Sequence, residues 1–563
     1  MTEPILSIRN LTVEIPTRHG IFKPVENVSY DIRPGEIRGV VGESGAGKSM
    51  TGNAVIGLLD PPAHISQGEI WLNGRRIDAL DPEEKRRIRG KEIGMIFQDP
   101  LTSLNPLFTI GEQLVETIQL HLGFTQAQAK ARALELLEAV SIPNPPERFN
   151  QYPHQFSGGM RQRVVIALAL CSEPSVIVAD EPTTALDVSI QAQVLDLIKK
   201  LARERQIGVI LVTHDMGVIA DTTEQVTVMY SGKVVESGTT DQILGAPTHE
   251  YTKSLISAVP RPHEKQYRFP QVSYGGRETV FKVEDLARNW PKTQASSSGK
   301  ILSVQGLTKR FVEKSSIIPS RQTYFTAVDE VSFDIHDGEV FGIVGESGSG
   351  KSTVARMIAT LLPVDGGKVM FDGKDVTQLD REGQAWYRRQ IQMIFQDPFS
   401  SLNPRMKVGD IVAEPLLHHK ILPRNQVEAR VRELLDKVGL ASDAYRKYPH
   451  AFSGGQRQRI SIARALATQP RFLICDEPTS ALDVSIQAQI LNILKDLQEH
   501  LGLTMLFISH DLPVVRQMCD RVGVMQRGKM VEVQETEALF SAPEHPYTRE
   551  LLNLMPRLAQ LSD

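Results

Sequence analysis

The chain has 563 residues, which at roughly 150 residues per domain indicates several domains and excludes a single small module. Lysine and arginine number 63 against 67 aspartate and glutamate residues, so the formal net charge is −4, and 41% of the residues are hydrophobic. These values are typical of a globular protein, without the basic excess of proteins that hold nucleic acid by its phosphates.

The N-terminus and the cysteines narrow the class further. Residues 1–9 contain no basic segment followed by an apolar stretch, so we expect no signal peptide. The apolar runs, such as 164–171, are too short to cross a bilayer. Cys171, Cys475 and Cys519 are scattered and form no Cys-x-x-Cys pair, which indicates buried thiols in a reducing compartment and not a disulfide framework or a zinc site.

The first element with a chemical signature is the apolar run 37–41, which we expect to be a buried strand. It leads into Gly-x-x-x-x-Gly-Lys-Ser and then into a stretch compatible with a helix. In such a loop the backbone N–H groups point at phosphate oxygens, the lysine reaches the β- and γ-phosphates and the serine can bind Mg²⁺. The sequence therefore predicts a P-loop formed by Gly42, Glu43, Ser44, Gly45, Ala46, Gly47, Lys48 and Ser49.

Three further segments follow in chain order. Gln98 stands in a Phe-Gln-Asp-Pro segment, residues 126–140 have the composition and periodicity of a helix, and Ser157 opens a Ser-Gly-Gly followed by Arg-Gln-Arg. From its residues alone, the 126–140 helix is only an amphipathic helix packed on its own domain.

A second apolar strand, 176–180, ends in Asp180 and is followed by Glu181. The aspartate is placed to hold the Mg²⁺ shell, and the glutamate can polarise a water in line with the γ-phosphate. Alone, the pair would be interpreted as solvated acids that cap a helix, but the preceding P-loop favours the magnesium interpretation. His214 follows a β-rich run, 34 residues after Asp180.

All of these motifs return in the same order in the second half of the chain. The offset between the copies is 303 at the P-loop, 298 at the Gln-Asp-Pro segment and 296 from Ser-Gly-Gly to the histidine, which again follows its aspartate by 34 residues. This equal spacing indicates a function for both histidines, and the long period indicates two whole domains in tandem. The second set is Gly345, Glu346, Ser347, Gly348, Ser349, Gly350, Lys351, Ser352, Gln396, Ser453, Gly454, Gly455, Gln456, Asp476, Glu477 and His510.

Together with Asp-Glu-Pro-Thr and Ala-Leu-Asp, this tandem set resembles the nucleotide-binding domains of ATP-binding cassette (ABC) proteins over essentially the whole chain apart from the linker. The segments 98–106 and 396–404, which share Gln-Asp-Pro and Ser-Leu-Asn-Pro, and the tails 248–252 and 544–548 are similar to those of the dipeptide/oligopeptide/nickel importer ATPases. The resemblance implies a fused pair of ATPases that are separate polypeptides in many importers.

The resemblance implies an α/β fold with two tandem P-loop domains, each with a mainly parallel core sheet, an antiparallel β subdomain and a helical subdomain. The first domain would span 1–260 and the second 301–563, with helical subdomains at about 105–156 and 403–452 that dock onto membrane subunits in the family. Between the domains, the Ser-, Gly- and charge-rich segment 261–300 is interpreted as a flexible connector, of which the middle piece 278–286 could pack as a short strand or turn on one of the domains.

The resemblance also assigns roles, with ATP and Mg²⁺ as cofactors. The domains would pack head to tail, so that Ser157, Gly158 and Gly159 meet the nucleotide on Lys351, and Ser453, Gly454, Gly455 and Gln456 meet the nucleotide on Lys48. Gln98 and Gln396 would bind Mg²⁺ or water beside the metal ligands Ser49, Asp180, Ser352 and Asp476. His214 and His510 would hold the γ-phosphate, the attacking water and the catalytic glutamates Glu181 and Glu477.

The two halves differ at three places: Met160 against Gln456, Ile15 against Phe311, and Leu168 against Arg464. The first difference removes an amide side chain beside one nucleotide. The second removes the aromatic that the family stacks on adenine, for which Phe22 is the alternative; the third has no explanation in the sequence. Both halves keep the lysine, the Asp-Glu pair and the histidine, so we expect two hydrolytic sites of unequal nucleotide affinity.

As an importer motor, the chain would lie peripherally on the cytoplasmic face of the bacterial inner membrane, with two permease subunits and a periplasmic or extracellular solute-binding protein, and without nucleic acid. Peptide is the default solute, while dipeptide, oligopeptide, glutathione, peptide antibiotic and nickel all stay open. Some relatives carry a cysteine cluster near the tail, but Cys519 stands alone there, so we expect no iron–sulfur centre.

Two other classes of tandem ATPase fit less well. Translation-factor ATPases that act on ribosomes resemble this chain less, because they lack the Ser-Leu-Asn-Pro segments and the His-Pro-Tyr-Thr tail. DNA-repair ATPases need zinc-binding cysteines that this chain does not have.

Overall fold

The computed structural model describes residues 3–18, 20–183, 188–260, 265–270, 283–291, 299–314, 323–480 and 482–555. The chain divides into two compact units, which we call the first cassette (Met1–Val259) and the second cassette (Pro260–Met555). Each contains a six-stranded sheet and a four-stranded sheet, so both repeats have the same architecture.

In the first cassette the six-stranded sheet has the order β10-β9-β3-β8-β7-β6. Strand β3 lies in the interior of this sheet and pairs in parallel with β8 and β9, while β10 is an antiparallel edge strand. All five residues of β3 are buried, as expected for a parallel strand covered on both faces. The strands are β3 (Ile37–Val41), β6 (Ile93–Ile96), β7 (Val176–Asp180), β8 (Gly208–Val212), β9 (Gln225–Tyr230) and β10 (Lys233–Thr239).

The second cassette repeats this sheet with the order β16-β17-β18-β13-β19-β20. Its interior strand β13 again pairs in parallel with two neighbours, and the edge strand β20 is antiparallel. The strands are β13 (Val340–Val344), β16 (Ile391–Ile394), β17 (Phe472–Asp476), β18 (Thr504–Ile508), β19 (Arg521–Gln526) and β20 (Lys529–Glu535).

A separate antiparallel sheet accompanies each parallel one, with the orders β2-β1-β4-β5 and β12-β11-β14-β15. Its strands in the first cassette are β1 (Leu6–Thr17), β2 (Gly20–Ile32), β4 (His64–Leu72) and β5 (Arg75–Arg76). In the second they are β11 (Lys300–Lys314), β12 (Thr323–His336), β14 (Gly366–Phe371) and β15 (Lys374–Asp375). The antiparallel β subdomain that the resemblance implied is therefore present in both cassettes.

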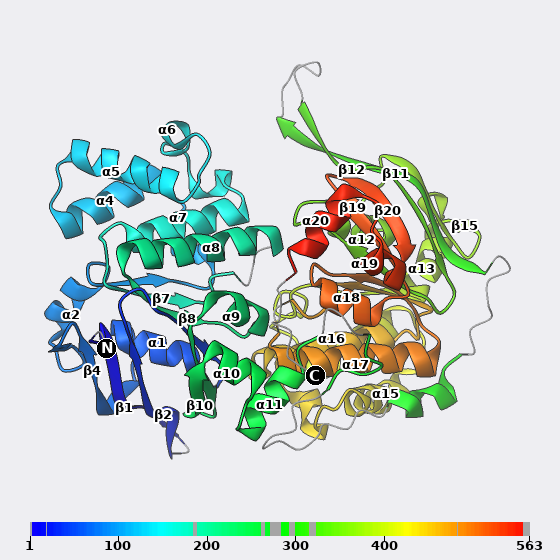
Figure 1. Ribbon diagram of the computed structural model, residues 1–563. Coiled ribbons are helices and arrows are strands. Elements are labelled where there is room, and N and C mark those ends of the chain that lie inside the picture. The colour runs from blue at the N-terminus through cyan, green and yellow to red at the C-terminus, as the bar shows by residue number, and fades with distance from the viewer. Residues whose placement is uncertain are drawn as a thin grey trace. The chain divides into compact units, whose positions relative to one another are not determined.

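Each cassette also has a group of helices between the Gln-Asp-Pro segment and the strand that ends in the aspartate, β7 or β17. In the first cassette, α4 to α7 gather at one end and β1, β2 and β4 at the other (Figure 1). The predicted 126–140 helix is α5, which a capping box at Thr125 begins. The helices are α3 (Pro100–Ser103), α4 (Ile110–Leu122), α5 (Gln126–Ala139), α6 (Pro145–Arg148) and α7 (Gly158–Leu170), and in the second cassette α14 (Val408–His418), α15 (Arg424–Lys437) and α16 (Gly454–Leu466).

Among the remaining helices, α1, α8 and α9, with their counterparts α12, α17 and α18, follow the strands that carry the motifs. In the first cassette the remaining helices are α1 (Lys48–Ile56), α2 (Pro82–Ile88), α8 (Val188–Arg205), α9 (Met216–Thr222), α10 (Thr240–Gly245) and α11 (Glu250–Ser257). In the second they are α12 (Lys351–Ile358), α13 (Arg381–Gln390), α17 (Val484–Leu501), α18 (Leu512–Met518), α19 (Thr536–Ser541) and α20 (Pro546–Asn553).

Part of the segment expected to be a flexible connector is packed on the second cassette. The Phe269 N–H donates to Asn492 Oδ1 at 3.0 Å, and Asn492 Nδ2 donates back to the Phe269 carbonyl at 2.8 Å. Phe269 shares the core of the second cassette with Val283, Leu286 and Trp290. The structure thus corrects the expectation of a flexible connector at 265–270, whereas the packing of 283–286 agrees with the sequence, which left packing of 278–286 on one of the domains open.

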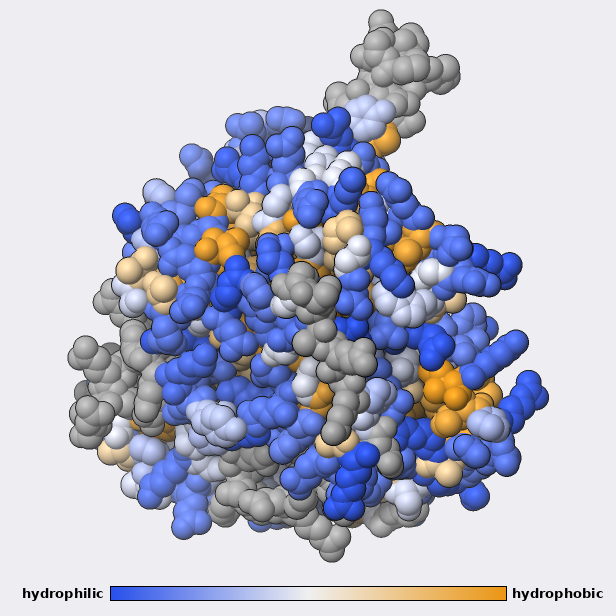
Figure 2. Space-filling view, turned by 90° about the vertical axis from the view of Figure 1, so that its right-hand side faces the viewer, coloured by the Kyte–Doolittle hydropathy of each residue, from blue (hydrophilic) through white to orange (hydrophobic). Residues whose placement is uncertain are grey.

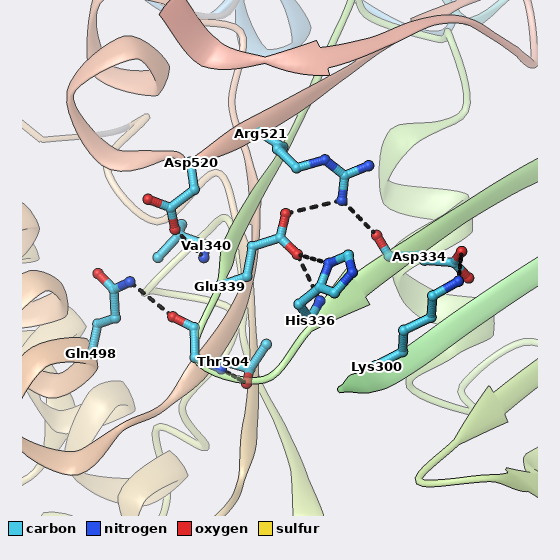
Figure 3. A network of polar contacts seen from close by, with 10 residues as sticks. Lys300, Asp334, His336, Glu339, Val340, Gln498, Thr504, Asp520 and Arg521 are labelled. Atoms are coloured by element: carbon cyan, nitrogen blue, oxygen red, sulfur yellow. Dashed lines mark hydrogen bonds and ion pairs between the residues drawn. The ribbon is translucent and has the colours of Figure 1, made fainter. Parts of the chain in front are cut away.

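A polar network fixes the end of β13 opposite the P-loop (Figure 3). The Val340 N–H donates to Asp520 Oδ2 at 2.9 Å. The preceding residue, Glu339, pairs with Arg521 at 3.2 Å and with His336 at 3.0 Å. Because the strand is held firmly at its beginning, its carboxyl end is a rigid support for the loop that follows.

The surface and the helices give one further observation. The face shown in Figure 2 is mostly hydrophilic, with hydrophobic residues in small separate groups. Among the described residues, none of the helices combines the length and the apolar character needed to span a membrane.

Candidate nucleotide-binding sites

The loop after the interior strand of each cassette wraps around the amino group of its lysine. Lys48 Nζ donates to the carbonyl oxygens of Gly42 and Glu43 at 2.7 and 3.0 Å. Lys351 makes the same two bonds in the second cassette, at 2.7 and 2.9 Å. Both lysines are almost fully buried, so the loop carbonyls replace the water around the ammonium group.

Glycine is required at the first loop position by the fold itself. Gly42 has φ +151°, and a Cβ there would lie 2.2 Å from the carbonyl oxygen of Met229 in β9. Gly345 repeats this with φ +147° and a distance of 2.1 Å from the Met525 carbonyl oxygen. A side chain at either position would displace the loop from the sheet, because a backbone atom cannot move aside as a flexible side chain can.

A pair of oxygen atoms lies beside each lysine. Ser49 Oγ donates to Asp180 Oδ1 at 2.9 Å, and Ser352 Oγ donates to Asp476 Oδ1 at the same distance. Burial raises the pKa of both aspartates, and the adjacent glutamate carboxylate adds to the rise. An aspartate whose charge is disfavoured by burial and by a like charge would gain from a bound cation.

Glu181 is the centre of a hydrogen-bonded group in the first cassette. Gln98 Nε2 donates to its Oε2 at 2.8 Å, and His214 Nδ1 lies 2.9 Å from its Oε1. The three side chains follow the neighbouring parallel strands β6, β7 and β8, whose carboxyl ends meet at one edge of the sheet. Glu181 itself has φ +47°, a strained conformation that its N–H bond to the Val212 carbonyl at 2.9 Å supports.

The second cassette has the same group around Glu477, which also has a left-handed φ of +46°. Gln396 Nε2 donates to Glu477 at 2.8 Å, and His510 Nδ1 lies 3.2 Å from it. Burial opposes the charges, but the contact between Glu477 and His510 lowers the pKa of the glutamate and raises the pKa of the histidine. The contact between the two side chains thus favours the charged form of each.

The Ser-Gly-Gly segments stand apart from these groups and begin helices. Ser157 Oγ accepts from the Met160 N–H at the start of α7, and Ser453 Oγ accepts from the Gln456 N–H at the start of α16. The Gln456 side chain accepts in return from the Ser453 N–H at 3.1 Å, which completes a capping box that Met160 cannot form.

The two glycines of each segment differ in what surrounds them. A Cβ on Gly159 would lie 2.6 Å from Ile190, and a Cβ on Gly455 would lie 2.2 Å from Ile486, so the second glycine allows the helix to pack closely. A Cβ on Gly158 would meet nothing within 4 Å. The first glycine is therefore not required by the packing of its own cassette.

Phe311 lies on β11 opposite Phe325 of β12, and both rings are about half exposed. At the matching place in the first cassette, Ile15 of β1 faces Phe22 of β2. Phe325 is two residues from Ala327, whose carbonyl oxygen lies 2.4 Å from where a Cβ on Gly350 would be. The strands that carry these exposed aromatic residues therefore pass beside the P-loop, with two such residues in the second cassette and one in the first.

Sequence reasoning left Arg464 without an explanation, and the structure supplies one. Arg464 Nη1 of α16 donates to the Ser401 carbonyl at 2.7 Å, and Ser401 Oγ is 3.1 Å from Ser461 Oγ of the same helix. These bonds tie the segment after Gln396 to α16. In the first cassette Leu168 packs against the hydrophobic core, so this polar link is specific to the second cassette.

Two tyrosines near the nucleotide loops were also missed. Tyr251 OH accepts from the Glu43 N–H at 3.0 Å, and Tyr547 OH accepts from the Glu346 N–H at 3.1 Å. The available signal in the sequence was the His-x-Tyr-Thr tail, which is repeated in both halves. By itself the tail indicates only a resemblance to the importer family and not a contact with the loop. The Ala-Leu-Asp segment of the first copy, within 184–187, lies outside the described residues, as does Ala481.

In each cassette the P-loop follows an interior parallel strand, and its serine is hydrogen-bonded to an aspartate. A glutamate, a glutamine and a histidine lie at the same edge of the sheet. This arrangement defines a P-loop ATPase domain, which is present twice in the chain. The comparisons with known proteins identify its kind. The ABC transporter family matches residues 25–184 and 328–480, and the family "Oligopeptide/dipeptide transporter, C-terminal region" matches 235–277 and 531–563.

Curated relatives match along almost the whole chain. The glutathione import ATP-binding protein GsiA of Escherichia coli O157:H7 is 45% identical over 561 residues, which cover 98% of this chain and 89% of the relative. The protein of the same name from Escherichia coli strain K12 is 44% identical with the same coverage. The chain belongs to the ABC transporter ATPases and carries the oligopeptide/dipeptide C-terminal region in both halves.

Solved structures also match, each over less than half of this chain. A dimeric ATP-binding cassette in a post-hydrolysis state with ADP and Pi is 31% identical, with a TM-score of 0.38, and covers 42% of this chain and 98% of its own. The structure of cbiO1 from Clostridium perfringens, part of an ABC transporter complex, is 30% identical with the same TM-score, and covers 46% and 97%. The family matches and the sheets confirm the predicted tandem α/β cassettes and the prediction of an ABC transporter ATPase of the peptide-importer type.

Proposed function

We propose that the chain powers uptake of a peptide-like solute by binding and hydrolysing MgATP at two sites. The observation that carries this proposal is the repeated geometry: in both cassettes a buried P-loop lysine, a serine–aspartate oxygen pair and a glutamine–glutamate–histidine group lie at one sheet edge. The relatives named for glutathione import supply the solute class, a small peptide.

Mg²⁺ fits the oxygen donors of the site. Ser49 with Asp180 and Ser352 with Asp476 offer a hydroxyl and a carboxylate, the hard oxygen ligands that this ion prefers, and Gln98 and Gln396 offer amide oxygens nearby. When bound, the ion neutralises charge on the β- and γ-phosphates. Burial raises the pKa of both aspartates and so disfavours their charge, a cost that a bound cation would offset.

The protein side chains then handle the phosphates and the attacking water. Lys48 and Lys351 leave their loop carbonyls to bind the phosphate oxygens, while N–H groups of the loops 42–49 and 345–352, other than those of Glu43 and Glu346, surround them. Glu181 and Glu477 are the bases that orient and deprotonate the water. His214 and His510 hold these carboxylates in place. In the second cassette the contact with His510 lowers the pKa of Glu477 against the opposing effect of burial, which favours the ionised carboxylate that can accept a proton.

We also propose that the cassettes pair head to tail, so that Ser157 and Gly158 complete the site on Lys351 while Ser453 and Gly454 complete the site on Lys48. The exposed helix N-termini support this pairing, because N–H groups and a serine hydroxyl at a helix start are suited to a γ-phosphate. Packing within the first cassette does not require a glycine at position 158, because a Cβ there would meet nothing within 4 Å. A nucleotide that approaches Gly158 would require this open space, which also supports the head-to-tail pairing.

The two sites would differ in nucleotide affinity. Phe311 and Phe325 offer two rings for adenine beside Lys351, and Phe22 alone does so beside Lys48. Gln456 caps its own helix, so its effect on the site of Lys48 would come from a better-ordered helix start and not from a direct amide contact.

As an importer motor, the chain would lie at the cytoplasmic face of a bacterial inner membrane with two permease subunits and a solute-binding protein. The test is uptake of labelled glutathione and dipeptides by cells that produce the chain with its neighbouring permeases. Uptake should require both Lys48 and Lys351. Sedimentation of the chain with ribosomes and not with membranes would contradict the proposal.

A further inference from the structure

The His-x-Tyr-Thr tails are the one motif that the nucleotide chemistry does not use, yet they reach the nucleotide loops. Each tail is the start of a short helix, α11 or α20, which is the second helix after the antiparallel edge strand of the core sheet. Tyr251 is completely buried and Tyr547 is 5% exposed. A buried hydroxyl in a conserved arrangement within one chain, present twice, points to a specific task.

The tail is built so that the tyrosine is held in one place. His249 Nδ1 accepts from the Tyr251 N–H at 3.1 Å, and His545 Nδ1 accepts from the Tyr547 N–H at 3.2 Å, so the histidine begins the helix. The preceding strand contributes a glutamate: Glu532 accepts from the His545 N–H at 3.1 Å and from the Thr548 hydroxyl. Burial opposes the charge of Glu532, but these bonds lower its pKa, so it is an ionised anchor.

The tyrosine hydroxyl then reaches the peptide that the P-loop lysine uses. Tyr547 OH accepts from the Glu346 N–H, and the carbonyl of the same peptide group, that of Gly345, accepts from Lys351 Nζ at 2.7 Å. The first cassette repeats this arrangement, with Tyr251 on the Glu43 N–H and Lys48 Nζ on the Gly42 carbonyl at 2.7 Å. One peptide group of each loop is thus fixed on its N–H side by the tail and on its carbonyl side by the lysine.

We propose that Tyr251 and Tyr547 are positioning residues that hold the two P-loops in the conformation that receives nucleotide. Without the hydroxyl, the loop N–H loses its partner in a buried place, and the peptide turns to find another. The carbonyl that holds the lysine turns with it, and the N–H groups of the loop are no longer aligned for phosphate. The oligopeptide/dipeptide C-terminal region therefore acts directly on ATP binding.

The test uses the full chain with Tyr251→Phe, Tyr547→Phe and both together, and measures MgATP affinity with a fluorescent ATP analogue and steady-state ATPase. Each single variant should weaken nucleotide binding at one site by about 3- to 10-fold, as expected for one lost hydrogen bond. The KM for ATP should rise in the same proportion, while kcat at saturating ATP stays within about twofold.

Tyr387→Phe is the matched control. Tyr387 is also fully buried, and its hydroxyl donates to the Ile358 carbonyl at 2.6 Å, at the end of α12 away from the loop. Tyr387→Phe removes a buried tyrosine hydroxyl, as the tail variants do, so it should lower the melting temperature without changing the affinity for ATP. If the tail variants changed only the melting temperature, or changed the affinity no more than Tyr387→Phe, the positioning role would be refuted.

A second measurement covers variants that do not fold. In the unmutated chain without nucleotide, hydrogen exchange at the Glu346 and Glu43 amides should be slow, because each N–H is bonded to a buried hydroxyl. Exchange at the rate of an open loop would refute the proposal. The inference rests on the proposed roles of the P-loops, and Lys351→Ala separates the two: ATP binding unaffected by that change would refute those roles and not the tyrosine contact.

Discussion

Replacing Glu477 by Gln is the most direct perturbation of the proposed chemistry. The change keeps the shape of the side chain and the bond from Gln396, but it removes the carboxylate that is paired with His510. A general base contributes about 10²- to 10⁴-fold to a rate, which corresponds to about 3–5 kcal/mol of barrier. Hydrolysis at the site of Lys351 should therefore nearly cease.

The effect on the whole chain depends on whether the two sites work together. The first cassette has the same contact between Gln98 and Glu181 at 2.8 Å, so Glu181→Gln should remove as much catalysis as Glu477→Gln. Independent sites would leave about half of the turnover in each single variant. If the sites close together around both nucleotides, each single variant should lose far more than half.

The assay is steady-state phosphate release by the full chain at saturating MgATP, with ATP binding measured in parallel. Glu428→Gln, which changes an exposed glutamate on α15, is the control and should keep full turnover. A Glu181→Gln or Glu477→Gln variant with unchanged turnover would refute two hydrolytic sites. Turnover reduced to half in each would refute coupling between them.

Three further changes test other parts of the structure. Phe311→Ala should weaken ATP binding roughly 2- to 12-fold through lost stacking, measured by titration with a fluorescent analogue, and unchanged affinity would argue against an adenine contact. Arg464→Leu should destabilise the second cassette by about 1.5–3 kcal/mol in urea, because the Ser401 carbonyl loses a charged donor; an unshifted midpoint would contradict this. Glu477 raises the pKa of His510 against the opposing effect of burial. The pair therefore contributes its full stabilisation of the fold below the ordinary histidine pKa of 6.5. This stabilisation is lost as the pH rises through the raised pKa. The melting-temperature difference between wild type and His510→Gln should therefore shrink with rising pH, and a growing difference would refute the pairing.

Much of the site could be predicted because its parts are contiguous motifs on parallel strands. Asp180, Gln98 and His214 are far apart in sequence, but each follows a strand of one parallel sheet, and the carboxyl ends of such strands share an edge. The motif residues therefore needed no tertiary information to be grouped. The repetition of the whole set at nearly constant offset gave the same grouping a second time.

Other contacts could not be predicted because no motif or periodicity encodes them. Tyr251 meets Glu43 across 208 residues of chain, and only the folding of α11 against the loop brings them together. Arg464 needed the position of the Ser401 carbonyl to acquire a role. The burial of Phe269 depended on Asn492, a polar residue of α17 whose two bonds to the backbone are visible only in the folded chain.

The sequence by itself determined the duplication, the fold class, the P-loops and the acidic and histidine groups, since these follow from local patterns and from the rule that parallel strands end at one edge. The tertiary structure decided how each loop is held, which part of the linker is buried and where the two cassettes differ in their internal bonds. These features depend on single hydrogen bonds between distant backbone and side-chain atoms, whose geometry is set only when the cores pack.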